Sequence, residues 1–312
     1  MSLSGRDAYR DELTNLARVN EKIICLEADL GGKNHKFQNE LPNRFFNLGI
    51  AEMAGIDMAA GLAEKGLVPF FSTFASFSAL RAAESIKLAM GYMKKNIKIV
   101  AAYGGVSGGW FGSTHHSLED ISIIQSFQNI KIACPYGEEE TRKVIREASL
   151  SPEPYYIRLS RNDTFESMIR AENDSCDKIL YQDNKRHKTD LCIISVGEQG
   201  TEIAKKIYSN THNTVHAHLC YIDRENLESY VSELRSVSQK FFVVEEHRST
   251  GSTASYLSLL MPDCEVYSHD CGELWPSFGG THTEVLGELG FSYENAITQF
   301  QEIRNKYKLL NV

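Results

Sequence analysis

Residues 50–74, IAEMAGIDMAAGLAEKGLVPFFSTF, carry the pattern that decides the fold. Small and apolar residues dominate 50–66, which predicts a closely packed helix that ends at Gly66. The apolar run at 68–74 predicts a buried strand, and so does IICLEADL at 23–30. A helix between two such strands is typical of a parallel sheet, because parallel neighbours need a crossover connection.

The same alternation continues through most of the chain. Strands are predicted at 97–103, 130–135 and 154–160, and helices at 76–92, 118–127 and 138–150. From Asn162 to Asp190 the pattern becomes polar and charged, and beyond it strands and helices alternate again. We therefore expect an α/β protein of two three-layer αβα domains with mainly parallel sheets. The first domain is expected over 1–165, a linker over 166–187 and the second domain over 188–312.

Composition argues against several classes of function. The 312 residues have a formal net charge of -8, which disfavours nucleic acid as a partner. No run approaches the roughly 18 apolar residues that cross a bilayer, so we expect no membrane contact. The charged first residues and the 7 scattered cysteines, which lack CxxC spacing, favour reduced thiols and a cytoplasmic location.

Glu52 stands in the first turn of the helix predicted at 50–66. A carboxylate there complements the helix dipole and needs no further function. Its neighbours Ala51, Met53 and Gly55 also place it near packed surface, where desolvation favours the protonated acid. A buried carboxyl that holds a proton suits acid–base chemistry, so Glu52 is a candidate catalytic residue.

Two phenylalanines follow the strand predicted at 68–74. Phe74 and Phe77 are three residues apart, so both rings face one way if the chain turns helical there. Such pairs usually pack in a core. They can also form a flat apolar wall for a planar ligand, because offset aromatic stacking adds to burial.

The loop 104–112 is rich in glycine and precedes two adjacent histidines, His115 and His116. Glycines let backbone approach a ligand closely, but neither a GxGxxG nor a Walker spacing is present. Neighbouring side chains diverge, so we expect at most one of these histidines to enter a pocket. Ser117 is the expected N-cap of the next helix, with Asp120 three residues later.

Two arginines are candidates for binding an anion. Arg161 directly follows a predicted strand and Arg6 lies near the start of the chain. Together they could clamp an anion at the carboxyl end of the sheet, where ligands of α/β proteins gather. Taken singly, each is better explained by a surface ion pair.

Three potential metal ligands alternate along the strand predicted at 214–222. His216, His218 and Cys220 share one face of that strand. Three nearly collinear ligands suit tetrahedral zinc poorly. We therefore favour a partly buried polar face and expect no metal site there.

Five segments in order resemble the pyrimidine-binding and C-terminal domains of thiamine-diphosphate-dependent transketolases: LEADLGG, RFFNLGIAEMAGIDMAAGLA, FFSTFASF, GSTHHSLEDI and PYYIRLSRND. The resemblance covers essentially the whole chain. The motifs GIAE, STF and THHSLEDI in this order are far more specific than any one of them alone.

This resemblance implies a set of cofactor-binding residues. Glu52 would hydrogen-bond the aminopyrimidine of thiamine diphosphate and favour its imino form, which removes the proton from the thiazolium carbon. Phe74 would stack on the pyrimidine ring, and Phe77 would line the same pocket. Asp29 and Leu30 would lie beside the cofactor.

The resemblance also implies substrate contacts. His115 would contact substrate hydroxyls or the developing enolate, and Arg6 and Arg161 would hold the phosphate of a sugar phosphate. Two positions depart from the family pattern: Phe111 stands where many transketolases have Asp, and Tyr103 where many have His. The identity of the donor sugar is therefore not implied.

Full-length transketolases also carry a GDG motif followed by an Asn, which hold Mg2+ and the diphosphate, and this sequence has no GDG. Carboxylate and phosphate oxygens suit Mg2+, so we expect a partner subunit that carries GDG and the Asn to bind it. The chain is thus predicted to be the C-terminal subunit of a split enzyme, self-associating into a dimer or a heterotetramer. Apolar side chains near Glu52 and the loop 104–112 should then be exposed in the isolated chain.

The activity implied is transfer of a two-carbon ketol unit between sugar phosphates. Two related alternatives stay open, namely the beta subunit of a 2-oxo acid dehydrogenase and a deoxyxylulose phosphate synthase-like enzyme. A non-catalytic interaction module that retains the fold is an alternative from another class. The departures at Phe111 and Tyr103 leave that alternative open, whereas the presence of Glu52, Phe74 and His115 argues against it.

Overall fold

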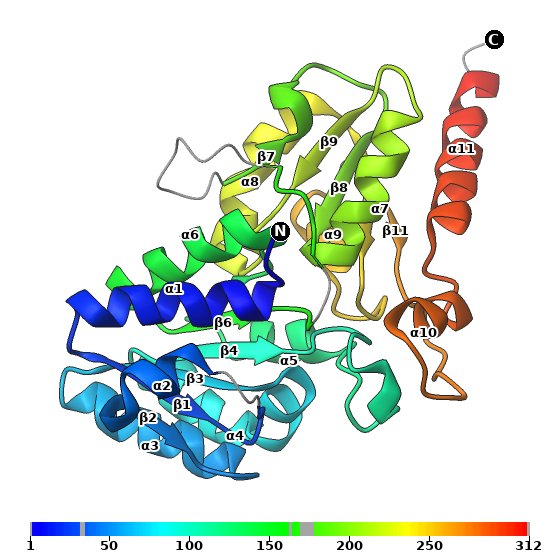
Figure 1. Cartoon of the computed structure of the whole chain (residues 1–312). Helices are drawn as coiled ribbons and strands as arrows, with labels where there is room; N and C mark the ends of the chain where they lie inside the picture. The colour runs from blue at the N-terminus through cyan, green and yellow to red at the C-terminus, as the bar shows by residue number, and fades with distance from the viewer. Residues whose placement is uncertain (1, 32–34, 162–163, 169–177, 311–312) are drawn as a thin grey trace.

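The computed structural model describes residues 2–31, 35–161, 164–168 and 178–310. Its strands form two sheets, one above the other in Figure 1. The first sheet is wholly parallel, in the order β2-β1-β3-β4-β6-β5. The second has the order β11-β10-β8-β9-β7 and is parallel except for β7. The predicted α/β class with mainly parallel sheets is confirmed.

The strands of the first sheet are β1 (Ile23–Glu27), β2 (Phe45–Asn47), β3 (Val68–Phe74), β4 (Lys98–Ala102), β5 (Lys131–Ala133) and β6 (Tyr155–Arg158). Those of the second are β7 (Leu180–Tyr181), β8 (Cys192–Val196), β9 (Val215–His218), β10 (Lys240–Glu245) and β11 (Glu265–His269). The α-helices are α1 (Gly5–Val19), α2 (Lys36–Glu40), α3 (Glu52–Glu64), α4 (Ala83–Ile86), α5 (Asp120–Ser126), α6 (Gly137–Leu150), α7 (Gly197–Ser209), α8 (Arg224–Val237), α9 (Thr253–Leu260), α10 (His282–Glu288) and α11 (Tyr293–Leu310).

Helices cover both faces of the first sheet. Side chains alternate across β1, so Ile23 and Cys25 pack in the core beneath α1 and α6. Ile24 and Leu26 point the other way and pack in the core that holds α3 and α4. Figure 1 shows the two pairs of helices on opposite sides of the strands. This arrangement is the predicted three-layer sandwich.

The second sheet is built in the same way. Ile193 and Val244 belong to a core shared with α7 and α11. Ile194 and Val243 face the opposite layer, which contains α8 and α9. Each sheet therefore buries apolar side chains on both of its faces, as parallel sheets do.

Some elements differ from the sequence prediction. The helix expected at 76–92 consists of π-helical turns over Phe77–Arg81 and Lys87–Tyr92 that flank the short α4. Apolar periodicity does not reveal one extra residue per turn. Within the segment predicted as linker, β7 pairs antiparallel with β9, with Leu180 opposite His218. Residues 169–177 of that segment lie outside the described residues.

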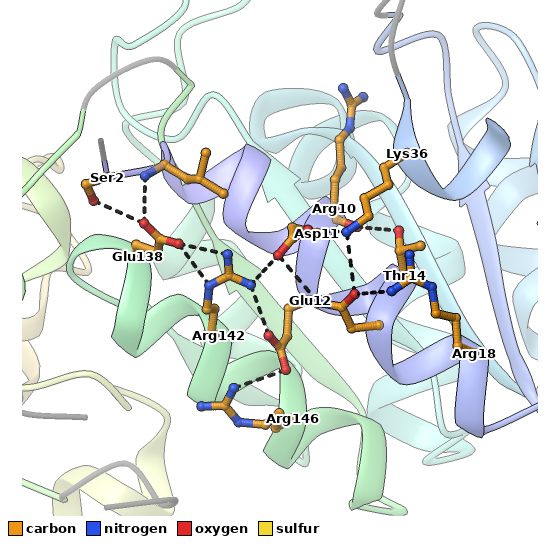
Figure 2. Close-up of polar contacts among 12 residues, drawn as sticks. Ser2, Arg10, Asp11, Glu12, Thr14, Arg18, Lys36, Glu138, Arg142 and Arg146 are labelled. Atoms are coloured by element: carbon orange, nitrogen blue, oxygen red, sulfur yellow. Dashed lines mark hydrogen bonds and ion pairs between the residues drawn. The ribbon is translucent and has the colours of Figure 1, made fainter. Parts of the chain in front are cut away.

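Ion pairs between α1 and α6 fix the helix that carries Arg6. Figure 2 shows Arg142 at the centre of this network. Its guanidinium donates to Asp11 Oδ2 at 2.6 Å, to Glu12 Oε2 at 3.1 Å and to Glu138 Oε1 at 2.7 Å. Several carboxylates sharing one guanidinium give a geometrically defined network, unlike an isolated surface pair.

Two further predictions bear on the environment of the chain. Within the described ranges, no helix combines the length and the apolar character needed to cross a membrane. Cys25, Cys134, Cys192, Cys220, Cys264 and Cys271 are free thiols, and Cys176 lies outside the described residues.

Candidate active site

The candidate site lies at the carboxyl ends of the first sheet's strands. Leu30 follows β1, Phe74 ends β3, Tyr103 follows β4 and Arg161 follows β6, while Glu52 begins α3. Ligands of parallel α/β sheets bind at this end because the connections there are free to form a crevice. Topology alone therefore gathers most of the residues predicted from the sequence.

Glu52 is buried, with only 2% of its surface exposed. Arg81 Nη1 donates to both of its carboxylate oxygens, to Oε1 at 3.0 Å and to Oε2 at 2.9 Å. The expected burial is confirmed, but the acid is not held by apolar neighbours alone, because the π-helical turn at Phe77–Arg81 brings a guanidinium onto the carboxylate. Sequence reasoning missed Arg81, whose only signal is its position four residues after Phe77.

Aromatic rings form a cluster around Phe74. The Phe74 ring centroid lies 4.4 Å from that of Tyr103 and 5.3 Å from that of Phe77. His115 contacts both phenylalanines, at 5.0 Å from Phe74 and 4.9 Å from Phe77. Phe111 stacks on His115 at 4.7 Å. The prediction that Phe74 and Phe77 share one side is confirmed, and the two departures, Tyr103 and Phe111, belong to the same ring cluster.

Arg81 joins Glu52 to the ring cluster. Its guanidinium carbon lies 4.1 Å from the centroid of the Phe77 ring, a cation–π contact, while Nη1 holds Glu52. Desolvation lowers the pKa of His115, and the positive charge of Arg81 acts in the same direction. His115 is therefore neutral near pH 7, and one ring nitrogen can accept a proton. Its Nδ1 lies 2.9 Å from Thr114 Oγ1.

Asp29 and Leu30 lie at the end of β1, next to this cluster in the sheet order. Leu30 is buried and packs with Tyr103 and Phe74. Asp29 is exposed, with a positive φ of 50°, and its amide N–H donates to Asn47 Oδ1 at 3.4 Å. Leu30 thus joins the ring cluster, whereas the Asp29 side chain faces solvent.

Arg6 and Arg161 both lie near Tyr103. The guanidinium carbon of Arg161 is 4.8 Å from the Tyr103 ring centroid. Burial raises the pKa of Tyr103, and the charges of Arg161 and then Arg6 oppose that rise. The Nε atoms of both arginines are buried without a hydrogen-bond partner among the described residues. A cavity of about 240 Å³ opens beside Arg161 and is also lined by Phe111 and His282.

The second domain fixes the glycine-rich loop. Glu246, which follows β10, accepts a hydrogen bond from the Val106 amide at 2.7 Å and is paired with His282 Nε2 at 2.8 Å. Gly105, at a φ of +65°, lies against this carboxylate. The expected capping by Ser117 is wrong, because its backbone bridges to Gly105 and the helix begins instead at Asp120.

Replacing Gly105 by Ala is expected to lower the free energy of unfolding by about 3–4 kcal/mol. The left-handed backbone disfavours a side chain, and the added Cβ would lie 2.0 Å from Glu246 Oε1. Glu246 would have to leave Val106 and His282. Urea unfolding measures the loss. Gly66→Ala, at a φ of +78° with no described atom within 4 Å of its Cβ, is the matched control and should cost about 1 kcal/mol. Equal losses would contradict the contact assigned to Glu246.

The histidines of β9 form a buried polar network. Ser195 Oγ lies 2.8 Å from His216 Nε2, and His218 Nε2 lies 2.9 Å from Glu140 Oε2 across the domain boundary. Both histidines are fully buried, and burial lowers the pKa of His216 to about 3. Among the residues that the structure describes, no group of three or more His, Cys, Asp or Glu side chains could hold a metal ion. The polar-face interpretation accounts for His216 and His218.

Comparison with known proteins decides the family. Residues 1–166 match the family described as transketolase, pyrimidine binding domain. The chain belongs to the transketolase family. A transketolase C-terminal section from Methanocaldococcus jannaschii is 33% identical over 249 residues, which cover 79% of this chain and 78% of the relative. A subunit of the apulose-4-phosphate transketolase from Phocaeicola vulgatus is 34% identical over 203 residues, 62% of each chain.

A solved structure supports the same assignment over nearly the whole length of this chain. It is described as a split gene transketolase, an inactive beta4 tetramer, and superposes with a TM-score of 0.79 at 25% identity. The match covers 97% of this chain and 98% of that one. The recognition made from the sequence motifs is therefore confirmed for both the family and the fold.

Membership of the transketolase family implies thiamine diphosphate as cofactor. The residues present fit its pyrimidine half. Glu52 is a buried hydrogen-bonding carboxylate, and the ring cluster offers flat apolar surface to a planar heterocycle. This combination of one buried polar group and several rings is the usual composition of a cofactor pocket.

Proposed function

We propose that this chain is the C-terminal subunit of a two-component transketolase that transfers a two-carbon ketol unit between sugar phosphates. The observation that carries the proposal is a buried carboxylate, Glu52, linked through Arg81 to the rings of Phe77, Phe74 and His115. Two relatives, one named as a C-terminal section and the other as one subunit of a transketolase, support the assignment to one half of a split enzyme.

Each residue of the site has a proposed function toward the cofactor. Bound thiamine diphosphate would supply a carbanion equivalent and an electron sink. Glu52 holds the aminopyrimidine and exchanges a proton with its ring nitrogen. Phe74 and Phe77 stack against the ring and exclude water, and Leu30 closes the pocket beside Phe74. Asp29, at the same strand end, contacts the cofactor from the solvent side.

The substrate would occupy the other side of the ring cluster. His115 is neutral near pH 7 and half-buried, so it can hydrogen-bond a sugar hydroxyl and move a proton. Arg6 and Arg161 bind the phosphate with guanidinium N–H groups, including the Nε atoms that have no hydrogen-bond partner within the described part of the protein. The cavity beside Arg161 gives the substrate room at this end.

The diphosphate and Mg2+ would be held by a partner subunit that carries GDG and a downstream Asn. Apolar side chains are exposed around Glu52, with Ile50 73% and Met53 43% exposed, and on the glycine-rich loop Trp110 is 74% exposed. Their exposure was predicted from the sequence, and an apolar surface of this kind is typical of an interface between subunits. We propose that the partner covers it and that the chain also self-associates, giving a heterotetramer.

Capture of the chain from its own cells tests the proposal. The expected result is a stoichiometric second protein that carries GDG followed by Asn. The reconstituted pair, with Mg2+ and thiamine diphosphate, should transfer a ketol unit from a ketose phosphate to an aldose phosphate. Decarboxylation of a 2-oxo acid by the same pair would assign the dehydrogenase alternative instead. A pair that neither binds thiamine diphosphate nor turns over any ketose phosphate would refute the proposal.

A further inference from the structure

Arg81 occupies the space between Glu52 and the ring cluster. Nη1 reaches both oxygens of the Glu52 carboxylate, and the guanidinium lies 4.1 Å above the Phe77 ring. Both carboxylate oxygens therefore have a donor already. A pyrimidine that stacks beside Phe77 and bonds Glu52 needs the position that this guanidinium fills.

The local backbone holds Arg81 in this position. The π-helical turn over Phe77–Arg81 is closed by a hydrogen bond from the Ala82 amide to the Phe77 carbonyl at 3.1 Å. This turn places the Phe77 ring and the Arg81 guanidinium on the same side. π-helical turns are rare and occur frequently at functional sites.

When the ion pair opens, the Arg81 side chain is the one that can move, because it is the more exposed of the two. The Arg81 side chain is 45% exposed, whereas the Glu52 side chain is 2% exposed. A half-exposed guanidinium regains water when it turns outward, but the carboxylate stays buried and needs a new donor. Ile50, which is 73% exposed, belongs to the surface assigned above to the partner subunit, and Leu80, the residue directly before Arg81, is 57% exposed.

We propose that Arg81 is a positioning residue. In the unassembled chain it occupies both oxygens of the Glu52 carboxylate, and it releases this carboxylate when thiamine diphosphate binds in the assembled enzyme. This inference rests on the proposed function. Because the Glu52–Arg81 ion pair must open before the cofactor can bond Glu52, the free energy of this pair lowers the apparent affinity for the cofactor. Assembly with the partner subunit and exposure of the cofactor-binding carboxylate are then coupled events.

The first test uses the chain alone and does not depend on the cofactor. Thermal unfolding is measured for Glu52→Gln, Arg81→Gln and the double variant. Arg81→Gln should lower Tm by several degrees, because the buried carboxylate loses its partner, and adding Glu52→Gln should restore most of the loss. Arg224→Gln, which removes an exposed pair with Glu228, is the control and should leave Tm unchanged. Additive effects would overturn the inference.

The second test measures the dissociation constant of thiamine diphosphate, with Mg2+ present, for the complex with the partner subunit. Arg81→Gln should bind the cofactor about tenfold more tightly, as removal of a competing closed state predicts, and Arg81→Lys should remain near wild type. A purely structural function of Arg81 would weaken binding instead. Unchanged or weaker binding by Arg81→Gln overturns the inference while wild-type binding still supports the proposed function. Absence of binding by the wild-type complex refutes both.

Discussion

Turnover of a ketose phosphate by the assembled enzyme should fall about a thousandfold when Glu52 is replaced by Gln. Gln keeps the size and one carbonyl oxygen of the side chain but cannot hold or give up the proton. Because Glu52 is buried at the start of α3, water has little access to take over its proton transfer. The measurement is kcat with saturating thiamine diphosphate, so that weaker cofactor binding does not mimic the loss.

The matched control for Glu52→Gln is Glu64→Gln, at the other end of the same helix. Glu64 is exposed and pairs with Lys95 at the surface, so this change should leave kcat within about twofold. The folded state should survive both substitutions, as circular dichroism can check, because in the Glu52 variant the half-exposed Arg81 can turn to water. Near-normal turnover by Glu52→Gln would remove this residue from the catalytic assignment.

The fold was predictable because its evidence is local. Apolar runs such as VPFFSTF mark strands buried on both faces, and Gly66, at a φ of +78°, ends α3 as the sequence indicated. The edge strands β2 and β7 were missed because they are short and carry little periodicity. The π-helical turns were missed because a helix with one extra residue per turn still looks helical in a pattern of apolar residues.

The residues of the candidate site that belong to the quoted sequence motifs were predictable. Glu52, Phe74, Phe77 and His115 come together as the motif order implied. Arg81 was not predicted, because the pattern of polar and apolar residues is the same for an arginine that pairs with a buried carboxylate and for an arginine that is exposed to solvent.

The contact of the second domain with the glycine-rich loop was also not predictable. Glu246 accepts the Val106 amide from 140 residues away in the sequence. No local pattern encodes such a pair, because it depends on how the two sheets are placed. Its effect is local nonetheless, since it fixes the backbone that leads from Tyr103 to His115.

A second large effect is expected at the phosphate end of the site. Arg161→Gln should lower kcat/KM for a ketose phosphate about a hundredfold, because hydrogen bonds to charged groups contribute about 1.5–3 kcal/mol and Gln cannot reproduce the guanidinium fork. The structure also gives the reason for choosing Arg161. Arg161 and Arg6 both have buried Nε atoms without a hydrogen-bond partner in the described ranges, although Arg6 Nε lies 3.8 Å from Asp7 Oδ1. Burial, followed by the nearby charge of Arg10, lowers the pKa of Arg6. The charge of Arg161 also acts on Arg6 in this direction, so an anion bound to both guanidinium groups would be stabilised by their positive charges.

The choice of substrate separates phosphate binding by Arg161 from a structural function. For an unphosphorylated ketose of the same length, kcat/KM should change less than about threefold in Arg161→Gln, because that substrate makes no bond to the guanidinium. Arg6→Gln should show the same selectivity, and Arg186→Gln, at a surface pair with Glu233, should show neither effect. An equal loss on both substrates would mean that Arg161 mainly supports the Tyr103 ring beneath it, 4.8 Å away, and through it the ring cluster. A loss confined to the phosphorylated substrate assigns the phosphate to this end of the site and thereby orients the sugar, with its other end toward His115.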